Sequence, residues 1–500
     1  MKKILKLLTL SLALLMLLST MMSCLKKNNG EPSDESGSTS DVVDSESESV
    51  DLMADIPTGD YNGYKFKMVV PEYVWAQYST DMLGGVGTTN FNKAVYERNQ
   101  KVEKELNITL DCIHIDAVTL TTDIRSQIKA SSADNYDAMW QQVSRTSVLS
   151  QEGCLYDLTQ AEALNLSKPW WYTDFAEDVH LGDKRYAMFG ALNTIYHSAF
   201  GVCAFNKDLL KVIDPTADLY QIYNDGKWTL EKMNYYMKLA SSDANGDGTR
   251  DTSDDYFGLA QHHNTLYQML TSCGQTVTTE GSNGYPTYNG LSTSFISTWE
   301  YIVDNISDPN YACIPGITNG YSAYQQNGGD YNTVFAEGRS LLLIQSCGAL
   351  NLINNADIDY GVIGYPKLDE DSDYRSPVYY GVAGVCVLNN NQDVERTATI
   401  LENMSAYSYG TVDIDFVENT LYYKYTQEAN AVNTLQNVLS TGTIDIAYVY
   451  EKCLGADKSM NRYLQDALKA RNRNVVSLFA EVETTLKSNI QKSVIFYARG

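Results

Sequence analysis

The chain has 500 residues, of which 62 are acidic and 37 are basic, so its formal net charge is −25. Nucleic acids and anionic membrane surfaces repel such a chain, and we expect no nucleic-acid binding. Residues 61–500 are too many for one compact core and predict a body of two lobes.

The N-terminus has the pattern of an export signal. Three lysines within the first six residues precede an apolar run from Leu7 to Leu18, which is too short to span a bilayer. The following "MMSC" resembles the bacterial lipoprotein box. This resemblance implies a signal peptide at residues 1–23 and a lipid such as palmitate on Cys24. An ordinary signal peptide with an unrelated cysteine is the alternative.

Residues 24–60 are predicted to be a disordered linker. Ten acidic residues and no basic ones lie between Glu31 and Asp60, among many Ser, Thr and Gly. Such a composition cannot bury enough apolar surface to fold. Together with lipidated Cys24, the linker would tether the body to the outer face of the cell membrane.

The folded part begins with alternating strands and helices. The segments "YKFKMVV" and "ITLDCIHID" predict strands over residues 64–70 and 108–115, and the apolar residues between them recur at helical spacing. A helix around Ile124 and Ile128 then precedes a short strand, "YDAMW", which is expected to end at Trp140. This order predicts a parallel α/β sheet. Ligands bind beyond the carboxyl ends of such strands, so Trp140 is a candidate ligand contact.

The segment "DANGDGTRDTSD", residues 243–254, follows the template of a calcium-binding loop. Gly248 takes the sharp turn, and Asp254 is shorter than the usual last ligand, Glu, so Asp255 is an alternative there. The predicted ligands are Asp243, Asn245, Asp247, Thr249, Asp251 and Asp254. A helix is expected before the loop and a strand after it, without a second loop. We therefore predict a structural Ca²⁺ rather than a sensor, with an empty acidic turn as the alternative.

The chain has no strong catalytic motif. It lacks G-x-S-x-G, H-E-x-x-H and G-x-x-x-x-G-K-[ST], and the neighbouring His262 and His263 would face opposite sides of a strand. We therefore expect no enzymatic activity. A glycosidase needs only two carboxylates, so a cell-surface carbohydrate-active enzyme remains the alternative. The 37 tyrosines, against 12 phenylalanines, suit stacking on sugar rings, although Tyr can also replace Phe across an exported surface.

Several motifs, in this order, resemble the extracellular solute-binding lipoproteins of bacterial ABC importers, in the carbohydrate-associated branch. They are "AVYERNQKVEKELNI", "YDAMWQQVSRTSVLSQEGCLYDLT", "KPWW", "AFNKDLL", "GKWTLEKM", "FAEGRSLLLI" and "YGVAGVCVLNNN". The resemblance implies an α/β fold of the two-lobed periplasmic-binding-protein type (type II), in which helices flank a mostly parallel sheet in each lobe. Residues 61–200 with 390–440 would form lobe 1, residues 201–389 lobe 2, and the helices of 441–500 would pack on both.

The resemblance also implies where a ligand would be bound. The chain would cross between the lobes near residues 196–206 and 379–389. The implied ligand contacts are Tyr196, His197, Ser346, Cys347, Tyr379 and Tyr380, in addition to Trp140. For His197, a hydrogen-bonded position in the hinge is the alternative.

The implied function is capture of a small solute, such as a sugar or oligosaccharide, by hinge closure, followed by delivery to an ABC permease. The protein would act as an extracytoplasmic, membrane-anchored monomer. A glycan-binding adhesin or sensor is a further alternative. Eight cysteines besides Cys24 leave the disulfide pairing open, and we expect buried thiols at Cys203 and Cys386.

Overall fold

The computed structural model describes residues 52–53, 55–72, 81–82, 89–130, 136–262, 265–314, 329–379, 381–422, 429–450 and 460–498. The chain divides into two units, Met1–Asp51 and Leu52–Gly500, and the second unit is described here. The predicted signal peptide, Cys24, most of the linker and Tyr380 lie outside the described residues. The end of the predicted linker lies against the folded body, since the Asn403 amide donates a 2.8 Å hydrogen bond to the carbonyl of Pro57.

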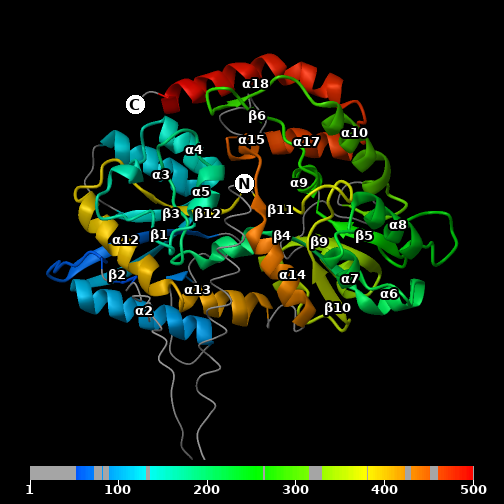
Figure 1. The fold of residues 1–500 in the computed structure, drawn as a ribbon, viewed down its shortest axis with the longest axis horizontal. Coiled ribbons are helices and arrows are strands. Elements are labelled where there is room, and N and C mark those ends of the chain that lie inside the picture. Colours follow the sequence, from blue (N-terminus) through cyan, green and yellow to red (C-terminus); the bar gives the residue numbers. More distant parts are fainter. Residues whose placement is uncertain are drawn as a thin grey trace, which may run out of the picture. The chain divides into compact units, whose positions relative to one another are not determined.

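The first sheet has four strands in the order β12-β3-β1-β2 (Figure 1). Strands β1, β2 and β3 are parallel, and β12 is antiparallel to β3. The bounds are Tyr64–Glu72 for β1, Ile108–Asp116 for β2, Ala138–Gln142 for β3 and Ala383–Val387 for β12. The two predicted helices are α2 (Asn90–Leu106) and α3 (Ala117–Ala130). Both helices are confirmed. The periodic apolar residues of α2 are buried on one face.

The second sheet has five strands in the order β10-β4-β9-β5-β8. Strands β5, β8 and β9 are parallel, and β4 is antiparallel to both β9 and β10. The bounds are Gly201–Asn206 for β4, Phe257–Gln261 for β5, Ala312–Cys313 for β8, Ser340–Ser346 for β9 and Tyr360–Ile363 for β10. The strand predicted to follow the calcium-like loop is therefore confirmed as β5.

Helices surround both sheets. The first sheet and its helices are called lobe 1, and the second sheet and its helices lobe 2. Helices before the C-terminal region are α4 (Val143–Gln151), η3 (Leu158–Gln160), α5 (Thr173–Asp178), η4 (Thr194–Ala199), α6 (Lys207–Ile213), α7 (Leu219–Asn224), α8 (Leu230–Ala240), α9 (Thr265–Ser272), α10 (Thr293–Tyr301), η5 (Ile302–Ile306), α11 (Gly329–Ala336) and η6 (Cys347–Leu352). Thr229 is the N-cap of α8, and its hydroxyl accepts the amide of Lys232.

Each sheet contains one antiparallel strand, β12 in the first sheet and β4 in the second. In each case the chain forms this strand just after it crosses from the other lobe. Strand β4 follows the elements of the first sheet directly, and β12 follows β10 of the second. The two connections lie side by side, because Phe200 forms an antiparallel bridge with Val378 and the amide of Tyr379 donates to the carbonyl of Ala199 at 2.9 Å. The lobes are thus joined by adjacent segments of backbone, as a hinge requires.

A third connection between the lobes runs through β13. The sequence did not predict it. The two-residue strand β11 (Ser376–Pro377) pairs in parallel with β13 (Gly442–Thr443). A Cβ atom at Gly442 would lie 2.3 Å from the ring of Phe200, so the close packing of the connections requires glycine there. The remaining short strands, β6 (Thr279–Glu280) and β7 (Pro286–Thr287), pair with each other.

The C-terminal region is mostly helical, as predicted, and it packs on both lobes. Its helices are α12 (Val394–Ser408), α13 (Val412–Ile414), η7 (Asp415–Tyr422), α14 (Ala429–Ser440), α15 (Ile446–Val449), α17 (Met460–Lys469) and α18 (Val475–Ala498). Helix α12 packs on α2 of lobe 1, whereas α14 packs on β10 and α7 of lobe 2. The expected assignment of residues 390–440 to lobe 1 therefore fits α12 but not α14.

The buried cores explain several aromatic and sulfur-containing residues. The indoles of Trp170 and Trp171 donate to the Glu402 carboxylate at 3.0 and 2.8 Å, so the "KPWW" motif packs lobe 1 against α12. The seven described cysteines form no disulfide, and Cys203 and Cys386 are buried thiols as expected. Among the described residues, no helix combines the length and the apolar character needed to cross a bilayer.

Candidate functional site

The carboxyl ends of the parallel strands carry polar side chains, several of which are partly exposed. In lobe 1, β3 ends at Gln142 and is followed by Arg145 in the first turn of α4. In lobe 2, β5 is followed by His262, and β9 ends with Gln345 and Ser346. Because ligands of open α/β sheets bind beyond these ends, the two edges form the candidate solute site.

In lobe 2 the candidate site is a network of amide, hydroxyl and aromatic groups around Gln345. Its Nε2 donates to the hydroxyl of Tyr331 at 3.2 Å and to Oδ1 of Asn332 at 3.1 Å. Its Oε1 accepts the amide of Ser346 at 3.0 Å. The ring of His262 lies 5.7 Å from that of Tyr331. The side chain of Gln345 is therefore fixed at the strand end while it is still partly exposed.

The imidazole of His262 is neutral at physiological pH. Burial lowers its pKa to about 4, and the charge of Lys469 acts in the same direction. The polar groups of the network around Gln345, with His262, are thus an imidazole, two amides and two hydroxyls without net charge. Such groups donate and accept hydrogen bonds but do not offer a formal charge to a bound molecule.

In lobe 1 the strand end is organised by Gln142 and Arg145. Oε1 of Gln142 accepts Nε of Arg145 at 3.3 Å, and Nη1 of Arg145 donates to the hydroxyl of Thr121 at 3.1 Å. The preceding Gln141 is buried, and its Nε2 has no hydrogen-bond partner among the described residues. Amide and guanidinium donors therefore occupy this edge.

The sequence predicts that the strand ends at Trp140, but in the structure Trp140 lies inside β3. Strand β3 continues for two residues, to Gln142, and the Trp140 side chain is fully buried. Its partner across the strand pair is Val385 of β12. The strand was expected to stop at Trp140 because the polar Gln141 and Gln142 follow, but both glutamines pair with β12.

The other predicted contacts gather where the chain crosses between the lobes. Tyr196 and His197 lie on η4, immediately before the first connection. Ser346 ends β9 opposite Gly201, and the amide of Cys347 donates to the carbonyl of Phe200 at 2.7 Å. Tyr379 lies on the neighbouring connection. The structure thus brings Tyr196, His197, Cys347 and Tyr379 close to one another, although the Cys347 side chain is fully buried.

His197 lies in an aromatic cluster at the first connection. Its ring centroid is 5.1 Å from that of Tyr196, 5.4 Å from Tyr172 and 6.5 Å from Phe416. Nδ1 of His197 is buried without a hydrogen-bond partner among the described residues, and burial lowers the pKa of the imidazole to about 4. His197 is therefore a neutral residue packed at the hinge.

A buried carboxylate, which the sequence did not indicate, fixes the start of η4. Asp81 follows β1 and accepts hydrogen bonds from the hydroxyl of Thr194 and, at 3.1 Å, from the amide of Ile195. The guanidinium of Arg98 on α2 donates to the Asp81 carbonyl. Burial raises the pKa of Asp81 to about 6, although these hydrogen bonds and the charge of Arg98 act in the opposite direction.

The calcium-like loop brings most of its predicted ligands together. Nδ2 of Asn245 donates to Asp247 at 3.1 Å and to Asp254 at 3.0 Å, and Asp243 accepts the amides of Gly246 and Gly248. Gly248 has a φ of +80°, as the sharp turn requires.

The last positions of the loop form an oxygen-rich cluster. Carboxylate oxygens of Asp251, Asp254 and Asp255 lie within 4.8 Å of one another. Asp255 is buried and accepts the amides of Ala244 and Asp251, so it also braces the loop. This donor set consists of oxygens, which fits a hard cation such as Ca²⁺.

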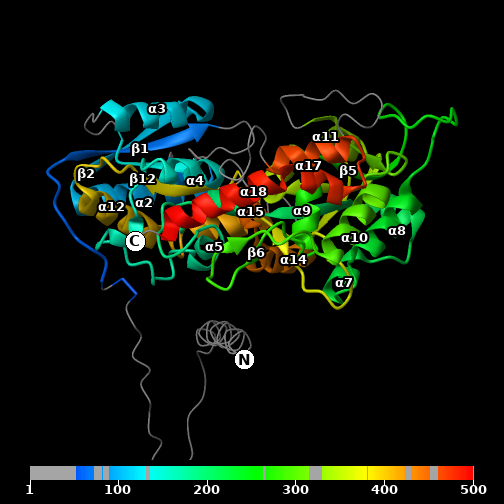
Figure 2. The same cartoon turned by 90° about the horizontal axis from the view of Figure 1, so that it is seen from above.

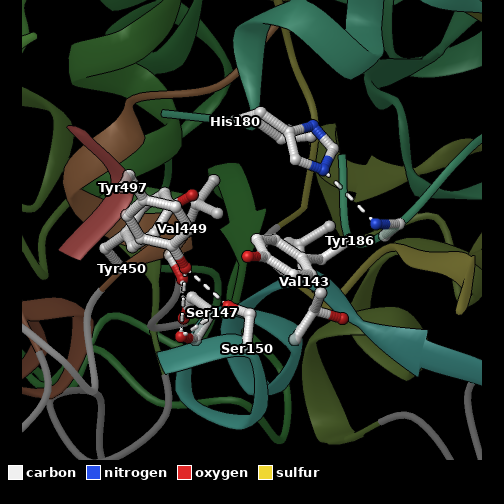
Figure 3. A pocket seen from close by; sticks show the side chains of 11 residues that line it. Val143, Ser147, Ser150, His180, Tyr186, Val449, Tyr450 and Tyr497 are labelled. Carbon is white, nitrogen blue, oxygen red and sulfur yellow. Dashed lines mark hydrogen bonds between the residues drawn. The ribbon is translucent and has the colours of Figure 1, made fainter. Parts of the chain in front are cut away.

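A small cavity lies apart from the predicted ligand residues (Figure 3). It is partly open to solvent and lies between α4, α15, the end of α18 and residues 179–187. Its polar lining groups are mostly engaged with one another, since Tyr497 bonds to Ser150 and the amide of Ala187 donates to His180. None of the predicted ligand contacts lines this cavity, and it is not the candidate solute site.

Solved structures similar to this chain include the two described next. An ABC substrate-binding protein from Listeria monocytogenes, in complex with cycloalternan, matches with a TM-score of 0.53 and 15% identity, covering 86% of this chain and 98% of its own. The maltose/maltodextrin-binding domain MalE from Bdellovibrio bacteriovorus, bound to maltotriose, has a TM-score of 0.48 and 15% identity, with 87% and 98% covered. The first of these likenesses supports the two-lobed, periplasmic-binding-protein-like α/β fold.

Comparison with curated protein sequences gave no match. Residues 97–406 match the family model of the bacterial extracellular solute-binding proteins. That match runs from α2 to α12 and includes both sheet edges of the candidate site. The chain therefore belongs to the family of bacterial extracellular solute-binding proteins.

Proposed function

We propose that this protein captures a neutral saccharide between its two lobes and delivers it, chemically unchanged, to an ABC permease. The observation that carries the proposal is the family match over residues 97–406, which includes the strand ends of both lobes. Solute binding would stabilise a closed arrangement of the lobes by its higher affinity for that state.

The chemistry of the lobe 2 strand ends supports an uncharged, hydroxyl-rich solute. The groups around Gln345 are amides, hydroxyls and a neutral imidazole, which can exchange hydrogen bonds with sugar hydroxyls. The similar protein from Listeria monocytogenes is in complex with cycloalternan, itself a saccharide, which supports the same class of ligand.

Attachment to the membrane is part of the proposal. The lipoprotein-like "MMSC" would place a lipid on Cys24, and the acidic segment that follows would allow the body to move above the membrane. The extracellular character of the family agrees with a position on the outer face of the cell membrane. We propose that the protein acts there as a monomer.

A structural Ca²⁺ in the loop of residues 243–254 completes the proposal. The residues that would hold the ion are Asp243, Asn245, Asp247, Thr249, Asp251 and Asp254. The bound ion would neutralise the clustered carboxylates and brace the connection between α8 and β5. Extracellular calcium is abundant enough to fill a weak site of this kind.

Thermal melting and calorimetry with a panel of saccharides test the proposed function. The panel contains maltotriose, cycloalternan and other neutral oligosaccharides, with peptides and organic acids as charged comparisons. A true ligand at 100 times its Kd stabilises the folded state by about 2.7 kcal/mol and raises the melting temperature. Chromatography of the recovered ligand shows whether it has been cleaved.

A variant at the strand end links binding to the candidate site. Gln345→Ala removes the amide at the centre of the lobe 2 network and should weaken binding by about 1 to 3 kcal/mol, or roughly five- to 150-fold. Gln221→Ala, on the exposed face of α7, is the matched control and should bind normally. Failure of every neutral saccharide to bind, or the recovery of cleaved product, would contradict the proposal.

A further inference from the structure

The C-terminal helix α18 contacts both lobes (Figures 1 and 2). Its first half packs on lobe 2, where the ring of Phe479 lies 6.1 Å from Tyr288 and 6.0 Å from Phe295. Just before the helix, the carbonyl of Asn472 accepts the indole of Trp299 at 2.9 Å. These contacts are aromatic and buried, so they hold the first half of α18 firmly on lobe 2.

The last two turns of α18 contact lobe 1 through polar side chains on α4. The hydroxyls of Tyr497 and Ser150 are hydrogen-bonded at 2.5 Å (Figure 3). The Gln151 amide donates to the hydroxyl of Ser493 at 3.0 Å. The Tyr497 hydroxyl also lies 3.4 Å from the carbonyl of Ser147. We call this set of contacts the α18 clasp.

The α18 clasp combines these hydrogen bonds with aromatic contacts of Tyr497, whose ring lies 6.0 Å from that of Tyr186 and 5.6 Å from that of Tyr450. Small, partly open spaces lie beside Tyr497 and beside Ser493. When the clasp opens, its hydrogen bonds can exchange with water at a small net cost.

Helix α4 connects the α18 clasp with the candidate solute site. The helix begins immediately after Gln142, and Arg145 in its first turn belongs to the strand end of lobe 1. Nine residues later it ends at Gln151, which is part of the clasp. A short helix transmits displacement of one end to the other, because its backbone hydrogen bonds keep it rigid.

We propose that the α18 clasp is a releasable contact that holds the two lobes in the arrangement of this structure. Helix α18 is fixed on lobe 2, so a change in the angle between the lobes must pull its last turns away from α4. The strength of the clasp then sets how readily the lobes move. This inference concerns the protein without solute and does not depend on which solute it takes.

Hydrogen exchange and X-ray scattering of the Tyr497→Phe protein test the proposal. The substitution removes one hydroxyl, keeps the ring and leaves Ser150 bonded to the Ser147 carbonyl at 3.1 Å, so the chain should fold. We expect amide exchange in residues 488–498 and 143–151 to rise about fivefold. We also expect a change in the distribution of interatomic distances seen by scattering. Ser150→Ala should produce the same two effects.

Tyr463→Phe is the matched control on the lobe 2 side. The Tyr463 hydroxyl donates to the carbonyl of Leu478 at 2.5 Å and so binds α17 to the first half of α18. Its removal should leave exchange in residues 143–151 and the scattering unchanged. The proposal is overturned if Tyr497→Phe leaves α4 exchange and scattering as in the wild type. It is equally overturned if Tyr463→Phe reproduces both effects.

Discussion

Buried carboxylates fasten the segments that connect the lobes. Asp81 accepts hydrogen bonds at the start of η4, and Asp445, which follows the third connection, accepts the amides of Val277 at 2.6 Å and Ala447 at 2.9 Å. Burial raises the pKa of each carboxyl group to about 6, while the hydrogen bonds oppose that change. The hinge therefore contains acids that titrate well above the range of exposed aspartates.

We expect Asp81 to make folding stability depend on pH between about 4 and 6. Its pKa is about 6 in the folded protein and 3.8 in a free chain, so the folded state binds this proton more tightly. The free energy of unfolding must then fall as the pH rises through this interval, by at most about 3 kcal/mol. Asp81→Asn resembles the protonated acid and should reduce the difference in stability between pH 5 and pH 7, as measured by urea unfolding.

An exposed aspartate provides the control for this measurement. Asp225 is exposed at the end of α7. The Asp225→Asn protein should keep the wild-type difference in the free energy of unfolding between pH 5 and pH 7. If Asp81→Asn keeps that difference as well, the buried carboxyl group does not control the pH dependence. Asp445 acts in the same direction, so part of the dependence should survive in the Asp81 variant.

Single residues were the hardest part of the molecule to predict from the sequence. Cys203 and Cys386 were correctly predicted as buried thiols because apolar residues surround them. Gln345 was missed, although a glutamine after the apolar "LLLI" is a signal for a strand end. Asp81 carried no signal, since its role depends on Thr194 and Arg98, which are distant in the sequence and meet it only in the fold.

At the scale of single elements, the loop between α8 and β5 packs against the start of β5 and so affects the stability of the lobe 2 sheet. Asp255 is buried under the loop, and Ser242 bridges Tyr256 across it. Gly258 then packs so tightly on α8 that a Cβ atom would lie 2.2 Å from the backbone of Met237. Movement of the loop would therefore also displace the first residues of β5.

We expect removal of Ca²⁺ to destabilise this element. Excess EDTA should lower the melting temperature of the protein, because clustered carboxylates of residues 243–254 then repel one another without a cation. Added Ca²⁺ should restore it. Asp247→Ala should melt at a lower temperature and lose its response to EDTA, as measured by differential scanning calorimetry.

The control for the metal is again Asp225, an acid outside the loop. Asp225→Ala should retain the full response to EDTA. A wild-type melting temperature that is the same with and without EDTA would show that the loop needs no cation.

Whole elements were predicted better than residues because their patterns are local. Alternating apolar residues located β1 and β2, and helical spacing located α2. The expected helices of residues 441–500 include α17 and α18, which are separated where Arg471 takes a φ of +47°. The third connection was missed because β11 and β13 have two residues each, too few for a pattern.

At the scale of the whole molecule, the exchange of antiparallel strands links the lobes. Strand β12 completes the first sheet only after the chain has passed through all five strands of the second, which come from residues 201–363. The first sheet therefore cannot form completely from one continuous stretch of chain. Folding of the lobes should therefore be coupled, and their relative motion is confined to the connecting segments around Phe200, Val378 and Gly442.

Hinge motion around these segments should make the protein more compact when it binds its solute. We expect saturation with the saccharide that raises the melting temperature to reduce the radius of gyration measured by X-ray scattering. Gln345→Ala should have the same radius of gyration without ligand and should need a higher saccharide concentration for the same reduction. An unchanged radius at saturating ligand would mean that the lobes do not close on the solute, because closure brings the two strand edges together around it.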